Sequence, residues 1–155
     1  MVIQRWQSVF LLITFALMAC FSFLSLGQVQ TADVSYNFTA CGFYPEGINT
    51  AAVSPAPLLT WPLFILSIAS TSLAFICIFL YKKLNIQIGL ALLEIILIMA
   101  TIAIAYYYGN CSFENVACSW SALALAPVLA LISAIFARRC MRADRRLLRS
   151  ADRLR

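Results

Sequence analysis

Long unbroken runs of apolar residues dominate the chain, and shorter polar segments separate them. A helix needs about 20 residues to cross a hydrocarbon core of about 30 Å, and four runs reach that length. They lie at about residues 8–26, 58–81, 84–108 and 119–137. None alternates apolar and polar residues as the strands of a membrane barrel do. The pattern therefore predicts one domain, residues 1–137, that crosses a membrane four times as helices.

Composition supports a bilayer as the solvent of this chain. Of its 155 residues, 63% are hydrophobic and 11% are charged, and the mean hydropathy is +0.91. Soluble domains average roughly 45–50% apolar and about 25% charged residues. The chain has no histidine, which removes the most common general base and a frequent ligand of transition metals. The sequence predicts no catalytic residue, no cofactor and no metal site.

Positive charges lie on one side of the predicted bundle. Arg5 precedes the first span, Lys82 and Lys83 connect the second and third spans, and eight arginines follow the fourth. The loops on the other side, residues 27–57 and 109–118, contain no lysine or arginine. Under the positive-inside rule, both termini are therefore cytoplasmic and these two loops are extracytoplasmic.

The cytoplasmic arginine-rich tail, residues 138–155, is also amphipathic if it is helical. Cys140, Ala143 and Leu147 share its apolar side. We expect this side to enter the acyl boundary of the inner leaflet while the arginines contact the phosphates of anionic lipids. No aromatic residues for base stacking are interleaved in the tail, so nucleic acid is not the expected partner. The arginines that share the polar side are Arg138, Arg142, Arg145, Arg146, Arg149 and Arg153.

Five segments of the chain resemble one known family. They are VIQRWQSVFLL, TWPLF, LYKK with the following Gln87, APVLAL and the C-terminal RLLRSADRLR. These segments are similar to the uncharacterised integral-membrane family of Bacteroidota catalogued as domain of unknown function 4293. The likeness covers nearly the whole chain apart from the two outer loops. It implies a four-span protein of the bacterial inner membrane, and it assigns no activity and no site residue.

Glu94 is an acidic residue inside the third predicted span. It lies about ten residues after the start of that span, hence about 15 Å from the inner interface at about 1.5 Å per residue. An ionised acid at this depth costs about 2.5–3.5 kcal/mol even on insertion scales, so we expect the carboxyl group to be neutral. A buried acid in a span is a candidate functional residue by default.

Polar residues at matching depth are candidate partners of this acid. Thr14 lies in the first span, and Ser70 and Thr71 lie in the second. Pro127 in the fourth span would leave the carbonyl group of Leu123 without its helical donor. We favour a hydrogen-bonded contact that holds the bundle together. A proton or cation relay and a position facing lipid or a partner remain open.

Three cysteines lie in the predicted outer loops. A disulfide between Cys111 and Cys118 would contribute about 2–3 kcal/mol, and Cys41 could replace either residue because spacing does not fix the connectivity. Free thiols and thiol–disulfide exchange are the alternatives. Exchange usually needs a C-x-x-C pair near a positive charge, and the outer loops have neither. Cys20 closes a Leu-Met-Ala-Cys segment that resembles a lipobox, so a lipidated Cys20 also remains open.

The fourth span carries small residues at a four-residue interval. Such a stripe lets two helices approach closely in lipid, where van der Waals contact is the main attraction. We favour packing within the bundle, and the alternative is the seam of a homodimer. The stripe consists of Ala122, Ala126, Ala130 and Ala134.

The predicted fold class is an all-α membrane protein: an antiparallel bundle of four transmembrane helices with a C-terminal basic amphipathic helix. The first outer loop, with Phe38, Phe43 and Tyr44, should fold over the end of the bundle as a cap or a docking surface. We expect a non-enzymatic scaffold or accessory subunit that contacts lipid and a second copy or another membrane protein. Two alternatives are an extracytoplasmic thiol–disulfide exchange protein that uses Cys111 and Cys118, and a dimeric proton-coupled transporter that uses Glu94.

Overall fold

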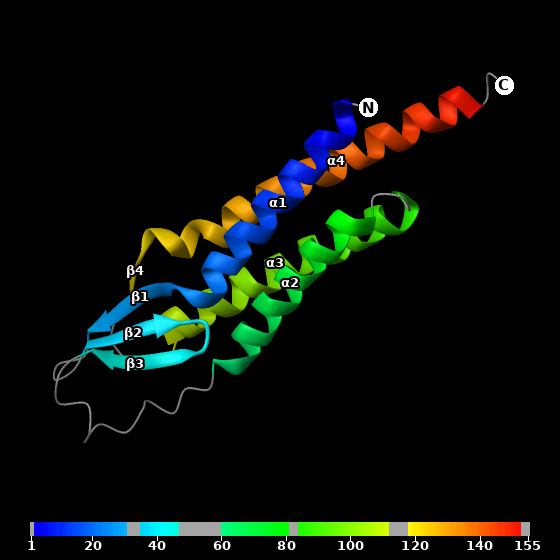
Figure 1. Cartoon of the computed structure of the whole chain (residues 1–155). Helices are drawn as coiled ribbons and strands as arrows, with labels where there is room; N and C mark the ends of the chain where they lie inside the picture. Colours follow the sequence, from blue (N-terminus) through cyan, green and yellow to red (C-terminus); the bar gives the residue numbers. More distant parts are fainter. Residues whose placement is uncertain (1, 31–34, 47–59, 81–83, 112–117, 153–155) are drawn as a thin grey trace.

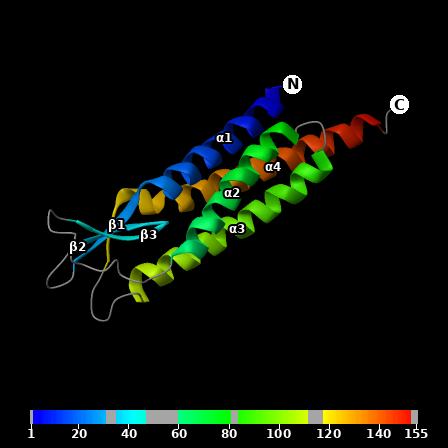
Figure 2. The ribbon, with the colours of Figure 1, turned by 60° about the horizontal axis from the view of Figure 1, so that its bottom comes forward.

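The computed structural model describes residues 2–30, 35–46, 60–80, 84–111 and 118–152 (Figure 1). Its four long helices are α1 (Val2–Phe23), α2 (Trp61–Phe79), α3 (Leu84–Cys111) and α4 (Ala126–Asp152). Helix α1 packs against α2 and α4, and α3 also packs against α2 and α4. Helices that follow one another in the chain run in opposite directions (Figures 1 and 2). The predicted antiparallel four-helix bundle is confirmed.

Each of the four helices is long and apolar enough to cross a membrane. Their surface carries large apolar side chains such as Leu12, Phe75 and Leu93, whereas polar side chains lie in the interior. This arrangement is the reverse of a water-soluble bundle, and it suits a solvent that cannot hydrogen-bond. The chain is therefore a multi-pass membrane protein. The buried polar residues of the helices are Gln7, Thr14, Ser22, Ser67, Ser70, Thr71, Gln87, Glu94, Thr101 and Ser133.

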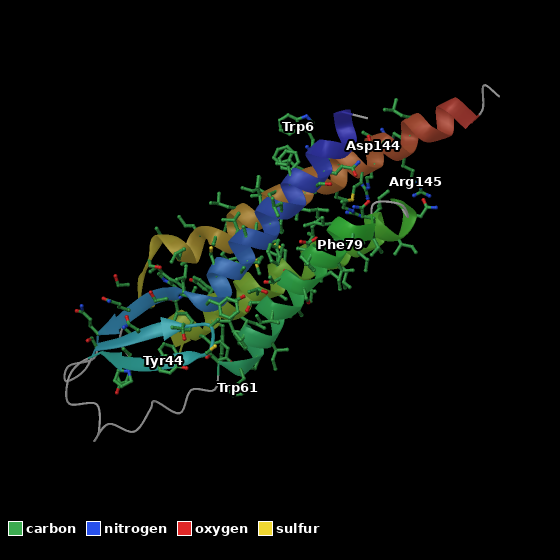
Figure 3. All side chains as sticks on the ribbon, in the orientation of Figure 1. Trp6, Tyr44, Trp61, Phe79, Asp144 and Arg145 are labelled. Carbon is green, nitrogen blue, oxygen red and sulfur yellow. The ribbon has the colours of Figure 1, made fainter. Side chains whose placement is uncertain are left out.

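Exposed aromatic residues mark the two ends of the bundle. Trp6 lies at the end where both chain termini are found, called here the terminal end, and Trp61 lies at the opposite end (Figure 3). Tyr106 and Tyr107, near the end of α3, are also exposed. Tryptophan and tyrosine favour the interface between hydrocarbon and water. The 19 residues of α2 span about 28 Å at about 1.5 Å per residue, close to the thickness of a hydrocarbon core.

A small antiparallel sheet, which the sequence analysis did not predict, covers the end of the bundle opposite the termini. Its strand order is β3-β2-β1-β4, and all neighbouring strands are antiparallel. The edge strand β4 comes from the second interhelical loop of this end, whereas the other three strands come from the first. We call this the sheet end (Figure 1). The strands are β1 (Ser25–Gln30), β2 (Ser35–Thr39), β3 (Gly42–Glu46) and β4 (Cys118–Trp120).

The sheet and the helices share one apolar core. Leu26 and Phe38 are fully buried and cluster with Phe21 of α1 and Leu63 of α2. Phe38 also stacks on Phe43 of β3, with ring centroids 4.7 Å apart. The described part of the first loop therefore packs onto the end of the bundle, as the sequence analysis expected of a cap.

The predicted span limits at the sheet end differ from the helix ends by three to seven residues. Helix α2 begins at Trp61 where residue 58 was predicted, and α3 ends at Cys111 where residue 108 was predicted. The first span was predicted to reach residue 26, but α1 ends at Phe23 and the chain enters β1 at Ser25. The fourth was predicted to begin at residue 119. Instead, residues 118–120 form β4, a short 3₁₀ helix η3 (Ala122–Leu125) follows, and α4 begins at Ala126. Apolar composition alone does not distinguish a helix from a strand at these residues. The strands β1 and β4 form because they pair with each other, and they are far apart in the sequence.

The two prolines of the helices both lie in first turns. Pro62 is the second residue of α2, where a missing amide hydrogen leaves no helical hydrogen bond unmade. Pro127 was predicted to interrupt a helix and leave the carbonyl group of Leu123 without a donor. Instead, Pro127 is the second residue of α4, and the amide of Ala126 donates to the carbonyl oxygen of Leu123. The predicted unpaired carbonyl is therefore absent at Leu123, which also lies far from the level of Glu94.

The arginine-rich tail continues α4 as far as Asp152 without a break after residue 137. Met141 is fully buried among residues of the other helices, including Leu11 of α1. Asp144 accepts a hydrogen bond from the side-chain amide of Gln7, and Figure 3 places Asp144 beside the first turns of α1. The start of the tail is thus part of the bundle, and the helix extends past α1 at the terminal end (Figure 1).

Candidate functional site

One hydrogen bond fixes the register between α2 and α3. The amide Nε2 of Gln87 donates to the carbonyl oxygen of Cys77 at 2.9 Å. Seven residues make about two helical turns, so a step of seven along each antiparallel helix reaches the same faces again. This step leads from Cys77 to Ser70 and from Gln87 to Glu94. Ser70 and Glu94 therefore lie at one level of the interface, and both are fully buried.

A second polar contact joins α1 and α4 in the interior. The hydroxyl groups of Thr14 and Ser133 are hydrogen-bonded to each other. Each hydroxyl also lies 3.0 Å from the carbonyl oxygen of Phe10, to which it can donate. Thr14 was predicted to contact Glu94, but its hydroxyl bonds to Ser133, which was not predicted. Ser133 could have been identified as a buried residue because it adjoins the alanine stripe, and this stripe faces the interior.

These polar groups form a layer between two apolar layers. Toward the terminal end, Leu11, Cys77, Ala91 and Met141 are buried in one cluster to which all four helices contribute. Toward the sheet end, a second buried cluster follows, formed by Met18, Ile98, Ala130 and Ala134. Thr14 lies between the two clusters on α1, and Glu94 lies between them on α3. The term polar layer is used below for Thr14, Ser70, Glu94 and Ser133, one residue from each helix.

The carboxyl group of Glu94 is enclosed and unpaired in the described structure. Neither of its oxygens has a hydrogen-bond partner there, and the hydroxyl of Ser70 has none either. An ionised carboxylate in a dry interior without a counter-ion is very costly. Glu94 is therefore best understood as a neutral acid, which carries one donor in addition to its acceptors. Ser70 lies at the same level of the α2–α3 interface, so the register makes its hydroxyl the best-placed acceptor for the O–H group of Glu94. Thr71, the other predicted partner, is largely buried and donates to the carbonyl oxygen of Ser67.

The alanine stripe of α4 packs inside the bundle for three of its four members. Ala126, Ala130 and Ala134 are buried, and the last two contact Met18 of α1 and Ile98 of α3. Ala122 lies in η3 and is exposed, so its inclusion in the packing stripe is wrong. A 3₁₀ helix has about 3.0 residues per turn, which breaks the four-residue register.

Replacing Ala130 by leucine should lower the stability of the bundle by about 1–2 kcal/mol, because added methyl groups have no space in a packed interior. The matched control Ala122→Leu should change stability by less than about 0.5 kcal/mol, since Ala122 is exposed. Thermal unfolding in detergent micelles, followed by circular dichroism, measures both. Equal losses in the two variants would mean that the close contact extends to Ala122 after all.

The arginines predicted to contact lipid phosphates differ in exposure. Arg142 and Arg146 are exposed, Arg145 is half-buried, and Arg138 is half-buried with an enclosed Nε atom that has no hydrogen-bond partner in the described structure. The side chains of Arg149 and Arg153 lie outside the described residues. Contact with lipid remains a prediction for all six.

The predicted disulfide receives no support from the structure. Cys41 is an exposed free thiol and Cys118 is a buried free thiol. The side chain of Cys111 lies outside the described residues. Burial raises the pKa of the Cys118 thiol above its ordinary value, which lowers the fraction of reactive thiolate at neutral pH. Cys20 is exposed on α1.

Cys118 should be alkylated by N-ethylmaleimide much more slowly than Cys41 in the folded protein, because its thiol is buried. Its rate should level off at a higher pH than the rate of an ordinary thiol, since burial raises the pKa of the Cys118 thiol. Peptide mapping by mass spectrometry over a series of pH values measures this, with denatured protein as the control. Equal rates for Cys41 and Cys118 in folded protein would contradict the burial of Cys118.

Taken together, these features define a small multi-pass helical membrane protein with a sheet over one end and an enclosed polar layer. Within the described residues, no group of three or more histidine, cysteine, aspartate or glutamate side chains could hold a metal ion. The family described as Domain of unknown function (DUF4293) matches residues 3–154, and the chain belongs to this family. The resemblance drawn from the sequence segments is thereby confirmed. No curated protein and no solved structure matches the chain.

Proposed function

We propose that this protein is a non-enzymatic scaffold or accessory subunit of the bacterial inner membrane, with both termini in the cytoplasm. The observation that carries the proposal is the closed interior at the level of Glu94. This residue is fully buried between one apolar cluster to which all four helices contribute and a second cluster formed by α1, α3 and α4. A substrate pathway would need to pass this level, so the surfaces of the bundle are the better candidates for function.

Two surfaces extend beyond the lipid-facing helices. The sheet presents Tyr44 of β3 to its outside, where the side chain is 54% exposed (Figure 3). At the terminal end, Arg142 and Arg146 of α4 are exposed on either side of Asp144, which contacts Gln7 of α1. Aromatic residues and arginine are both enriched in protein interfaces. In the proposed orientation, the sheet meets an extracytoplasmic partner and the arginines meet anionic lipids of the inner leaflet or a cytoplasmic partner.

The orientation rests on the positive-inside rule and is testable with two native thiols. Cys41 lies at the sheet end, and Cys140 lies in α4 beyond the apolar part of the helix. A membrane-impermeant maleimide applied to intact spheroplasts should label Cys41 and leave Cys140 unlabelled until the membrane is opened. Labelling of Cys140 in intact spheroplasts would overturn the proposed orientation.

The two alternative functions find less support in the geometry. Thiol–disulfide exchange through Cys118 requires an accessible thiolate, and this thiol is buried with a raised pKa. Proton-coupled transport through Glu94 requires access from both sides in turn, and the acid is enclosed by apolar side chains on both sides.

Photocrosslinking in native membranes tests the accessory role. A photoreactive phenylalanine analogue at Tyr44 or Arg142 should give a discrete protein adduct, because both positions are exposed on the proposed contact surfaces. The matched control is the same analogue at Leu93, which is exposed on the lipid-facing side of α3 and should give lipid adducts. No protein adduct from either surface position would argue against a scaffold or accessory subunit.

A further inference from the structure

A pocket lined by described residues lies outside the polar layer. Its volume is about 460 Å³, and it lies at the sheet end between the last turns of α3 and the segment from β4 through η3 into α4. Volumes of about 300–1,000 Å³ are typical of sites for small organic ligands. Its lining residues are Phe21, Ile102, Ala105, Tyr106, Trp120, Ser121, Ala122, Ala124, Leu125 and Pro127.

The pocket exists because the backbone turns away from α3 just where the side chains are small. The chain does not begin α4 directly after β4 but makes the 3₁₀ helix η3, whose Ala122 and Ala124 line the pocket. Ala105 of α3 forms a further part of the wall and is almost fully buried. Larger side chains at these positions would fill the space.

Trp120 forms a positioned wall of the pocket. Its indole ring lies directly against Gly109 of α3, where even a Cβ atom would collide with it. On another side, the ring makes an edge-to-face contact with Phe38, with centroids 6.1 Å apart. These two contacts fix the ring without filling the pocket.

The pocket opens onto the membrane-facing surface at the level of the aromatic residues. Tyr106 and Leu125 are both exposed and belong to its lining. Tyrosine and tryptophan favour the depth of the lipid headgroups, where their O–H and N–H groups can donate to ester oxygens. The pocket is thus apolar inside and carries donor groups from Tyr106 and Trp120 at the depth where lipid esters lie.

We propose that this pocket binds one hydrocarbon chain of a phospholipid from the leaflet at the sheet end. We expect an apolar occupant because the lining is predominantly apolar, and a lipid chain is the apolar molecule that borders the opening. Tyr106 and Trp120 would then face the glycerol ester groups. This site goes beyond the proposed accessory function and does not depend on it.

Retention of a brominated phospholipid tests the site, because bromine quenches a tryptophan that it contacts. Two single-tryptophan proteins are needed. One keeps Trp120 in a Trp6→Phe, Trp61→Phe background. The other keeps Trp61, which is exposed at the same end of the bundle, in a Trp6→Phe, Trp120→Phe background that leaves an aromatic ring in the pocket wall, and its retained lipid is counted as well. Each is purified in detergent, exchanged with phosphatidylcholine brominated on one chain, and freed of excess lipid by gel filtration.

We expect one phospholipid to remain bound per chain and the fluorescence of Trp120 to fall at least by half relative to the unbrominated lipid. The fluorescence of Trp61 should be unchanged. Ala124→Phe, which fills the pocket, should remove both the retained lipid and the quenching. Ala103→Phe, on the exposed face of the same part of α3, should keep both. If Ala124→Phe does not fold, Ala122→Phe replaces it, and the comparison of Trp120 with Trp61 remains decisive.

Several results would overturn the proposal. They are the absence of retained phospholipid, retained lipid that quenches Trp61 as strongly as Trp120, and retention that is unaffected in a folded pocket-filled variant. Quenching that disappears when the protein is diluted would mean that the lipid exchanges freely and is not retained, which also contradicts the proposal.

Discussion

Replacing Glu94 by lysine is expected to abolish assembly of the bundle, whereas replacing it by glutamine is expected to preserve it. Glu94 is fully buried in the polar layer, and no described residue forms an ion pair with it. A lysine there would place an uncompensated charge among apolar side chains, at a cost of about 2.5–3.5 kcal/mol or more. Glutamine has the same shape as the neutral acid and keeps a donor for Ser70. Yield of monodisperse protein after mild detergent extraction measures assembly.

The pair of variants also separates a packing role from proton transfer. A packing role predicts that Glu94→Gln retains wild-type stability and any associated phenotype. Ser70→Ala should then cost about 0.5–1.5 kcal/mol if its hydroxyl accepts from Glu94. Loss of transport or growth in a fully assembled Glu94→Gln variant would instead support a proton carrier. A well-assembled Glu94→Lys variant would contradict the enclosed site itself.

Replacing Gly27 by alanine is expected to detach β4 from β1 and to cost about 3 kcal/mol, the upper end of the overpacking range. A Cβ atom at Gly27 would lie 2.7 Å from the carbonyl oxygen of Ser119 and 3.0 Å from the sulfur of Cys118. The first obstacle is backbone, which cannot rotate away as a side chain can. Thermal unfolding reports the loss of stability, and faster alkylation of Cys118 reports the displaced strand.

Gly89→Ala is the matched control. Gly89 lies on α3, and a Cβ atom added there would meet nothing within 4 Å, so alanine should stabilise the helix by up to about 1 kcal/mol. Similar effects of the two substitutions would show that β1 and β4 are not in close contact.

The spans and the buried acid could be predicted from the sequence because the bilayer imposes a nearly one-dimensional constraint. A helix must be apolar for about 20 residues to cross it, and the runs around Phe75 and Leu93 satisfy this without reference to any neighbour. The depth of Glu94 followed from counting residues at a fixed rise. Ser70 lies at the level of Glu94 for the same reason, although neither side chain has a hydrogen-bond partner among the described residues.

The sheet could not be predicted in the same way because its stability comes from contacts distant in sequence. The three residues of β4 have no strand pattern of their own, and they are a strand because they pair with β1, about 90 positions earlier. The β2–β3 turn carries a local signal, since Thr39 and Gly42 exchange hydrogen bonds between the Thr39 hydroxyl and the Gly42 backbone. That signal was overlooked among the aromatic residues of the loop.

By itself the sequence determined the number of spans, their approximate limits, the family and the presence of an acid deep in the bundle. Hydropathy and charge act residue by residue, so they can be summed along the chain. Only the tertiary structure decided that Glu94 lies level with Ser70, that Ala122 leaves the packing stripe and that β4 joins a sheet with a pocket beside it. Register between helices and pairing between strands depend on how side chains from distant segments fit together. They therefore cannot be predicted by adding up the properties of neighbouring residues.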